Sequence, residues 1–315
     1  MTRYWKVAIL ALAFACSAQA QSPYQALDGE QGREVLPHVR VTVLVDNMAG
    51  GGPVLGEWGV AFLIETGKDQ ILFDTGEGRT LLGNAHALDV DLRKTKAIVI
   101  SHGHDDHTGG LEKALRACGR VDLFVHPAVF DTRYLKEGSR AVAFQTPFSR
   151  RQLKGRVRKI IETNGPTAVC EGVMVTGQIP RTTDFEDTGL RGRVFLDESL
   201  TTPDPILDDQ ALFFEVPEGV VILLGCGHSG LVNTVAYVSQ LTGGRPIYAI
   251  IGGTHLLGAS SQRMQKTVDA LGKYDIQKIM LSHCTGMAAY AELANALPGR
   301  SSWPASGTLI EFGGQ

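Results

Sequence analysis

The expected fold of this 315-residue chain depends most on ten residues, SHGHDDHTGG, at positions 101–110. They contain three histidines and two aspartates, and they follow an apolar run at 97–100 that is typical of a buried strand. Imidazole nitrogens and carboxylate oxygens are the ligands that zinc and similar divalent metals prefer. A solvated polar loop is the alternative. So dense a group of donors directly after a strand favours a metal site.

One loop cannot surround a metal ion, so further ligands are expected elsewhere. The chain has nine histidines, and three more of them follow apolar runs: His228 in GCGHSG, His255 in IGGTHL and His283 in LSHCTG. A single histidine after a strand is more often structural or exposed. Three repeats of this arrangement, each beside Gly, Ser or Thr, indicate one shared cavity at an edge of the sheets.

Strand-like runs occur in two series, and helical patterns accompany each of them. The first series lies at 40–45, 60–64, 71–73, 97–100 and 123–125, and the second at 173–175, 211–216, 220–224, 247–251, 279–281 and 309–312. Helical spacing begins near Leu111 and returns at 231–241, 262–271 and 288–297. The pattern predicts an α/β protein with two packed sheets and helices outside, in a single domain over 21–315.

Several motifs resemble those of a known family. FDTG at 73–76, HGHDDH at 102–107 and the later glycine-flanked histidines are similar to the metallo-β-lactamase superfamily, over nearly the whole chain from about residue 41. The resemblance implies an αββα sandwich, with two mixed β-sheets flanked by helices. Further stretches resemble one branch, which is named after an archaeal dihydropterin–ribofuranosylaminobenzene phosphate synthase: VLVDN at 43–47, TGQIPR at 176–181, DDQAL at 208–212, GCGHSGLVNT at 225–234 and HCTG at 283–286.

The resemblance also implies one or two bound metal ions, zinc in the first place, with manganese or iron as alternatives. The implied ligands of the first metal are His102, His104 and His228, and those of the second are Asp106, His107 and His283. Asp74 would lie behind the ligands and orient one of them. The alternative for Asp74 is an ordinary aspartate in a glycine turn.

Two residues depart from the family pattern or fit it less well. Cys226 stands where many members carry a bridging aspartate. Cys226 is either a soft thiolate ligand, which would favour zinc, or a small buried neighbour of the ligands. For His255 we expect a hydrogen bond to the substrate or to a developing oxyanion rather than metal ligation.

These residues predict metal-assisted hydrolysis. A metal-bound hydroxide would attack an ester, lactone or phosphoester-type substrate, and Asp106 would orient it and transfer its proton, with His255 as a second catalytic candidate. Metallo-β-lactamase or lactonase activity is one alternative. A non-catalytic metal- or ligand-binding protein of the same fold is another.

The first residues predict export. Arg3 and Lys6 precede an apolar run at 7–15 and the small-residue site AQA at 18–20, as in a secretory signal peptide at 1–20 that is cleaved near Ala20. We therefore expect a secreted or periplasmic protein. The apolar run at 7–15 is too short to span a bilayer, and we expect no other stretch to span one. In an oxidising compartment a Cys118–Cys170 disulfide is one expectation, and two small buried thiols are the other.

Charge gives limited information about partners. The formal net charge of −3 does not point to nucleic acid, so we expect a small-molecule substrate, and the oligomeric state stays open. A basic insertion at about 131–162 carries six Lys or Arg residues between 150 and 159. A solvated surface helix is the default interpretation of it. A basic lid that attracts an anionic substrate is the alternative.

Overall fold

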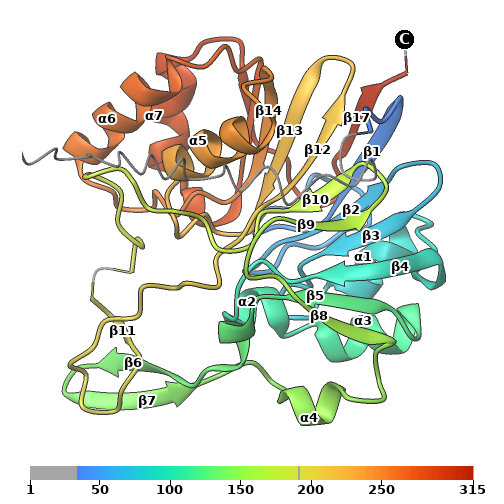
Figure 1. Cartoon of the computed structure of the whole chain (residues 1–315), viewed down its shortest axis with the longest axis vertical. Coiled ribbons are helices and arrows are strands. Elements are labelled where there is room, and N and C mark those ends of the chain that lie inside the picture. The colour runs from blue at the N-terminus through green and yellow to red at the C-terminus, as the bar shows by residue number, and fades with distance from the viewer. Residues whose placement is uncertain (1–33, 191, 315) are drawn as a thin grey trace, which may run out of the picture.

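Two seven-stranded β-sheets pack face to face in the computed structural model, which describes residues 34–190 and 192–314. Helices cover the outer face of each sheet, as Figure 1 shows. The expected αββα sandwich with two mixed sheets is therefore confirmed. The signal peptide predicted at 1–20 lies outside the described residues.

The first sheet contains the loop of the HGHDDH motif. Its strands lie in the order β17 (Leu309–Gly313), β1 (His38–Val45), β2 (Ala61–Glu65), β3 (Gln70–Phe73), β4 (Thr95–Val99), β5 (Asp122–Val125) and β8 (Lys159–Glu162). Pairing is antiparallel as far as β3 and parallel from β3 to β8. Helices α1 (Leu81–Ala87) and α3 (Leu111–Cys118) pack on its outer face, and the single turn α2 (Asp105–Thr108) lies inside the motif.

The second sheet brings the other histidine loops to the same edge. Its order is β16 (Ser301–Ser302), β15 (Lys278–Leu281), β14 (Ile247–Gly252), β13 (Gly219–Leu224), β12 (Leu212–Val216), β10 (Val173–Val175) and β9 (Thr167–Cys170). The strands from β13 to β16 are parallel, so their carboxyl ends share one edge. Helices α5 (Leu231–Leu241), α6 (Ser261–Leu271) and α7 (Met287–Ala296) cover the outer face.

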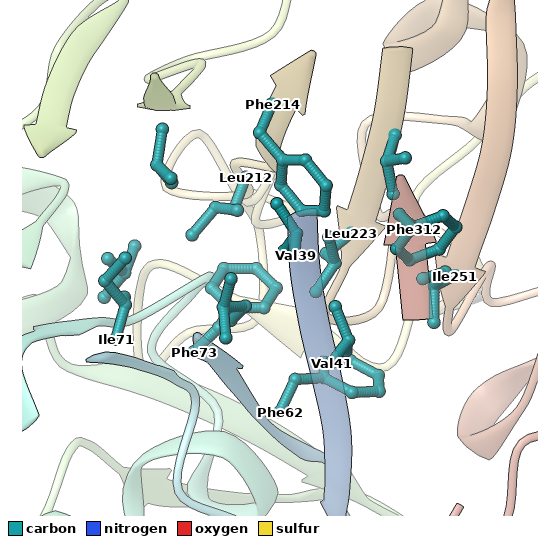
Figure 2. Packing of buried hydrophobic residues seen from close by; sticks show 14 of the residues in the cluster. Val39, Val41, Phe62, Ile71, Phe73, Leu212, Phe214, Leu223, Ile251 and Phe312 are labelled. Atoms are coloured by element: carbon teal, nitrogen blue, oxygen red, sulfur yellow. The ribbon is translucent and has the colours of Figure 1, made fainter. Parts of the chain in front are cut away.

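The main core lies between the two sheets. Figure 2 shows Phe62 and Phe73 from the first sheet facing Leu212 and Phe214 from the second. These side chains alternate along their strands with residues that pack under the outer helices, as the period of two in a strand requires. Three apolar layers therefore hold the strand ends at fixed positions.

Most of the basic segment does not form the expected surface helix. It forms the hairpin of β6 (Arg133–Glu137) and β7 (Arg140–Phe144), which pairs with β11 (Val194–Phe195) in a small third sheet, then the single turn α4 (Arg150–Leu153) and strand β8. Figure 1 shows the hairpin standing off the sandwich.

Several basic side chains of this segment are paired with acidic ones. Arg150 pairs with Glu162. Arg156 lies 3.0 Å from Glu112, and Arg158 lies 2.6 Å from Asp122. Three of the six positive charges between residues 150 and 159 are therefore matched by carboxylates, which weakens the case for a basic lid.

Of the two alternatives for Cys118 and Cys170, the structure has unpaired thiols and no disulfide between them. Both thiols are free, because Cys118 ends α3 outside the first sheet and Cys170 ends β9 in the second. Burial raises the pKa of both thiols, that of Cys170 to about 12. In the described part of the chain, no helix has the length and apolar character needed to cross a membrane.

The inter-sheet core gives a stability prediction. Phe214 is 1% exposed and its ring lies 6.0 Å from that of Phe312, edge to face. Phe214→Ala leaves a cavity between two rigid sheets and should lower the free energy of unfolding by about 3–5 kcal/mol, as measured by urea denaturation. The control Leu309→Ala removes a side chain that is 52% exposed and should change stability little. Equal effects of the two substitutions would contradict this account of the core.

Candidate metal centre

Four loops at the carboxyl ends of strands meet at one edge of the sandwich. They follow β4, β13, β14 and β15, and they carry all the histidines that the sequence singled out. Two of the donor groups correspond to the implied ligand sets: His102, His104 and His228 form the first, and Asp106, His107, Cys226 and His283 form the second. Within each group the donor atoms lie within 4.8 Å of one another. The shared cavity is confirmed, and its two groups match the two implied ligand sets with Cys226 added.

The first group fits a cation because its imidazoles are neutral. Burial lowers the pKa of His102 and His228 well below the usual range, and that of His104 to about 3. His102 Nε2 and His104 Nδ1 lie 2.9 Å apart. The Nε2 atoms of His104 and His228 are buried and have no hydrogen-bond partner among the described residues. A bound divalent metal would use these nitrogen lone pairs, which otherwise stay unsatisfied.

The loop that carries His228 is held from three sides. His228 Nδ1 donates to the carbonyl oxygen of Thr188 at 2.6 Å, which leaves Nε2 for the metal group. Arg181 Nη1 donates to the carbonyl oxygen of His228 at 2.6 Å. The carboxylate of Asp209 accepts from the next amide, that of Ser229, at 2.7 Å. Both rotation of the ring and movement of the loop are therefore restricted.

In the second group, Asp74 is placed to orient His107. Asp74 Oδ2 lies 2.7 Å from His107 Nδ1 and accepts from the Ser101 hydroxyl at 2.6 Å, and Asp74 Oδ1 accepts from the Ser101 amide at 2.7 Å. Burial opposes protonation of His107, but the carboxylates of Asp106 and Asp74 outweigh it and raise the pKa of His107 to about 9. Asp74 has a φ of +60°, a conformation that is costly outside glycine and concentrates at functional sites.

His283 is positioned by two residues that the sequence did not single out individually. Asn47 Oδ1 lies 2.9 Å from His283 Nδ1, and Asp46 accepts from the His283 amide at 3.0 Å. His283 Nε2 then lies 3.3 Å from Asp106 Oδ2 and 3.4 Å from Cys226 Sγ. Asp46 and Asn47 belong to the VLVDN stretch, and the available signal was a polar pair directly after an apolar strand.

The DDQ sequence at 208–210 holds two of the ligand loops at once. Asp208 accepts from the Gly103 amide at 2.7 Å, between His102 and His104. Asp209 holds the loop after His228, as described above. The side-chain amide of Gln210 donates to the carbonyl oxygen of Ile100, just before the HGHDDH loop, at 2.7 Å. Three consecutive residues thus fix the distance between the two loops.

Arg133 connects this scaffold to the β6–β7 hairpin. It is 1% exposed and donates to Asp204 at 2.6 Å and to Asp208 at 2.5 Å. The two carboxylates compensate the burial of its charge and raise its pKa. A β-carbon at Gly103 would lie 2.5 Å from Arg133 Nη1, so glycine is required at this contact.

Cys226 lies among the second donor group. Its Sγ is 3.1 Å from His107 Nε2, and the residue is 2% exposed. Burial raises the pKa of the thiol well above its usual range, so a thiolate there requires a cation beside it. This placement supports the thiolate alternative, and ligation by Cys226 stays a prediction.

His255 lies beside the first donor group. Its ring centroid is 4.3 Å from that of His228, and its donor atom lies within 4.8 Å of those of Cys226 and His228. Its φ is +46°, and its amide donates to Cys284 Sγ at 3.3 Å. His255 is therefore at the site, and its role as a substrate contact stays a prediction.

A cavity of about 300 Å³ opens directly on these donors. The donors in its wall include His104, Asp106, Cys226 and His255. Its other wall is apolar and is formed by Trp58, Leu135, Val142, Phe144, Leu190 and Val194. The ring of Phe144 lies 5.9 Å from that of His104. The hairpin thus covers the site with apolar side chains.

Comparison with known proteins agrees with the fold and the donor set. Residues 59–237 match the family model of the metallo-beta-lactamase superfamily, and the chain belongs to this superfamily. It is similar to the 7,8-dihydropterin-6-methyl-4-(beta-D-ribofuranosyl)-aminobenzene-5'-phosphate synthase of Methanocaldococcus jannaschii, with 29% identity over 80% of this chain and 89% of the relative. An uncharacterized protein of the same organism is 30% identical over 81% of this chain and 93% of its own length. The resemblance to this branch is therefore confirmed.

A solved structure agrees as well. Tm1679, described as a metal-dependent hydrolase of the beta-lactamase superfamily, is 25% identical to this chain, with a TM-score of 0.74. The match covers 88% of this chain and 100% of the other.

The Asp74–His107 contact predicts an effect on metal binding. Asp74→Asn weakens the hydrogen bond that orients His107, and it should lower metal affinity about 10–100-fold in a competition titration with a chromophoric chelator. The control Asp275→Asn alters a carboxylate that is 81% exposed and lies outside the donor groups, and it should leave the affinity unchanged. Wild-type affinity in Asp74→Asn would show that Asp74 does not support a ligand.

Proposed function

We propose that this protein is an exported, metal-dependent hydrolase of small-molecule esters, lactones or phosphoesters. The observation that carries the proposal is the pair of adjacent donor groups, His102–His104–His228 and Asp106–His107–Cys226–His283, which open into one pocket. Zinc is the proposed metal, because the donors are imidazole, carboxylate and thiolate. When bound, it supplies Lewis-acid polarisation of the scissile bond and activates water at neutral pH.

Asp106 has the best position for proton transfer. It belongs to the second donor group and also lines the pocket, so its carboxylate faces both the metal ligands and the substrate space. Its Oδ2 lies 3.6 Å from His107 Nε2 and 3.3 Å from His283 Nε2, which fixes its orientation. We assign it the orientation of the attacking water and the transfer of a proton to the leaving group. His255 is the second candidate, from another part of the pocket wall.

The wall of the pocket supports an apolar substrate group. Apolar side chains from β6, β7 and β11 face the donors, and the hairpin brings no basic side chain into this lining. Binding there gains free energy from the burial of apolar area. We therefore place an acyl or aryl group of the substrate beneath the hairpin.

Two alternatives remain at the same site. One is the synthase activity named for the Methanocaldococcus relative. It involves phosphorylated compounds, which we expect inside cells, so the export that we propose from residues 1–20 disfavours it. A non-catalytic binding protein is the other alternative. Metal analysis by mass spectrometry, followed by ester, lactone and phosphodiester reporters with and without chelator, separates these from a hydrolase. Turnover that chelator does not affect, or no turnover on any reporter, contradicts the proposal.

Substitution of donors should remove activity without unfolding the protein. His104→Ala and Asp106→Ala should each lower kcat/KM by at least about 100-fold, with little change in circular dichroism, because the donors lie on loops outside the apolar core. Asp275→Ala is the control, because this side chain is 81% exposed and lies outside the pocket lining, and it should retain wild-type activity. Full activity in either donor variant would remove the residue from the mechanism.

The apolar wall predicts chain-length selectivity. In a p-nitrophenyl ester series, Phe144→Ala should lower kcat/KM for the hexanoyl ester about tenfold and leave the acetyl ester nearly unchanged, because only the longer chain reaches the lost ring. The control Leu196→Ala changes an exposed residue beside β11 that does not line the pocket and should behave as wild type. Equal losses on both esters would show a structural effect of Phe144 instead.

A further inference from the structure

Ser101 lies behind the donor groups, between Asp74 and His102. It directly precedes the HGHDDH sequence, and it is fully buried, with an exposed fraction of 0%. Its hydroxyl donates to Asp74 Oδ2 at 2.6 Å, and the same oxygen lies 2.9 Å from His102 Nδ1. Its amide donates to Asp74 Oδ1 at 2.7 Å, which fixes the residue against the carboxylate. The hydroxyl therefore joins the Asp74 carboxylate to a proposed ligand of the first metal.

The single hydrogen of this hydroxyl determines which nitrogen of His102 can bind a metal. A serine hydroxyl carries one hydrogen, and here that hydrogen goes to the carboxylate. The oxygen can therefore only accept from His102, so Nδ1 carries the ring hydrogen and Nε2 keeps its lone pair. His102 Nε2 lies 2.9 Å from His104 Nδ1, inside the first donor group. The hydroxyl thus selects the tautomer of His102 that a metal at this group requires.

The same carboxylate oxygen also orients a member of the second donor group. Asp74 Oδ2 lies 2.7 Å from His107 Nδ1, and the rings of His102 and His107 have centroids 4.2 Å apart. His107 Nε2 then faces the second group, 3.1 Å from Cys226 Sγ. One oxygen atom therefore acts on one imidazole of each group, on His107 directly and on His102 through the Ser101 hydroxyl.

The second sheet leaves exactly the space that the hydroxyl needs. Gly225 follows β13 and packs against Ser101 and Asp74, so that a β-carbon there would overlap Ser101 Oγ and lie 2.8 Å from Asp74 Oδ2. Real β-carbons do not approach other atoms so closely. Glycine before Cys226 therefore allows the hydroxyl and the carboxylate to meet between the two ligand loops.

Other buried hydroxyls near the centre have a different kind of partner. Thr75 Oγ1 donates to the carbonyl oxygen of His107 at 2.8 Å, and Thr108 Oγ1 donates to that of His104 at 2.9 Å. These bonds hold the backbone of the loop. Ser101 bonds an imidazole nitrogen and a carboxylate instead, so its hydroxyl acts on the orientation of a ligand ring.

We propose that Ser101 is a positioning residue, whose hydroxyl transmits the orienting effect of Asp74 to His102 and so supports the first metal site. We call these two side chains the Asp74–Ser101 relay. The inference rests on the metal centre of the proposed function, but it requires no particular substrate. The sequence implied that Asp74 orients one ligand, whereas the relay gives it one ligand in each donor group.

The test is a competition titration of the protein with zinc and a chromophoric chelator. The binding phase that is missing in His104→Ala identifies the first site. Ser101→Ala should weaken this phase about tenfold and leave the other phase nearly unchanged, because the hydroxyl contacts the ring of His102 only through Nδ1. Asp74→Asn should weaken both phases, because its carboxylate serves both groups.

A matched control separates this effect from a general loss of stability. Thr267→Val removes another fully buried hydroxyl, which donates to the carbonyl oxygen of Arg263 at 2.8 Å within α6. It should leave both zinc phases unchanged. An unchanged first phase in Ser101→Ala would overturn the relay, and so would equal weakening of both phases, which a merely structural role would produce.

A measurement on the wild type keeps the proposal testable if Ser101→Ala does not fold. Nitrogen-15 NMR of the zinc-loaded protein, labelled at histidine, should show His102 bound through Nε2 with its hydrogen on Nδ1. Zinc bound through Nδ1 of His102 would overturn the relay.

Neither measurement depends on turnover, so the relay and the hydrolase can fail separately. Selective weakening of the first phase in a protein that hydrolyses no reporter would retain the relay and reject the hydrolase. Chelator-sensitive turnover without an effect of Ser101→Ala on zinc affinity would do the reverse. A wild type that binds no zinc would contradict both.

Discussion

Buried carboxylates that accept backbone N–H groups hold the metal centre in place. The loops after the strands cannot satisfy their amides within a sheet, and they are too buried for bulk water to do so. Asp46, Asp74, Asp208 and Asp209 each accept an amide from a loop that carries proposed ligands, those of His283, Ser101, Gly103 and Ser229. Hydrogen bonds to an ionised acceptor are about twice as strong as neutral ones. The ligand geometry is thus set by residues that bind no metal.

This arrangement concentrates negative charge around the centre. Asp74 and Asp106 both lie close to His107, and their combined field raises its pKa against the effect of burial. Buried charge is costly unless a partner compensates it. Arg133 compensates Asp204 and Asp208, and Arg181 holds the loop of His228 by its carbonyl oxygen. A divalent cation would compensate the remainder, which agrees with the neutral imidazoles and unpaired nitrogens of the first group.

The parts of the structure that apolar periodicity determines could be predicted from the sequence. Helix α5 has the expected limits, 231–241, and each expected strand is present, because these elements bury regular apolar faces. The HGHDDH loop and the later histidines were predictable because each directly follows such a strand. The two-sheet architecture was predictable because the strand-like runs occur in two series, each accompanied by helical patterns.

What could not be predicted depends on pairing over long distances in the sequence. Strand β6 pairs with β11, so that Leu135 faces Val194 about sixty positions later. Arg133 belongs to a segment with a basic composition, yet it is buried and forms ion pairs with Asp204 and Asp208. Asp46 and Asp208 belong to two stretches that resemble the branch, VLVDN and DDQAL, but the sequence indicates no partner for either carboxylate. Their roles follow only from which amides the fold brings to them.

The same long-distance contacts join the substrate pocket to the metal centre. Asp208 binds the Gly103 amide with one oxygen and Arg133, at the base of the hairpin, with the other. The hairpin then places Leu135 and Phe144 over the donors. A shift of the hairpin therefore acts on the turn between His102 and His104 through a single carboxylate. The position of the apolar pocket wall and the geometry of the first donor group thus depend on the same buried ion pair.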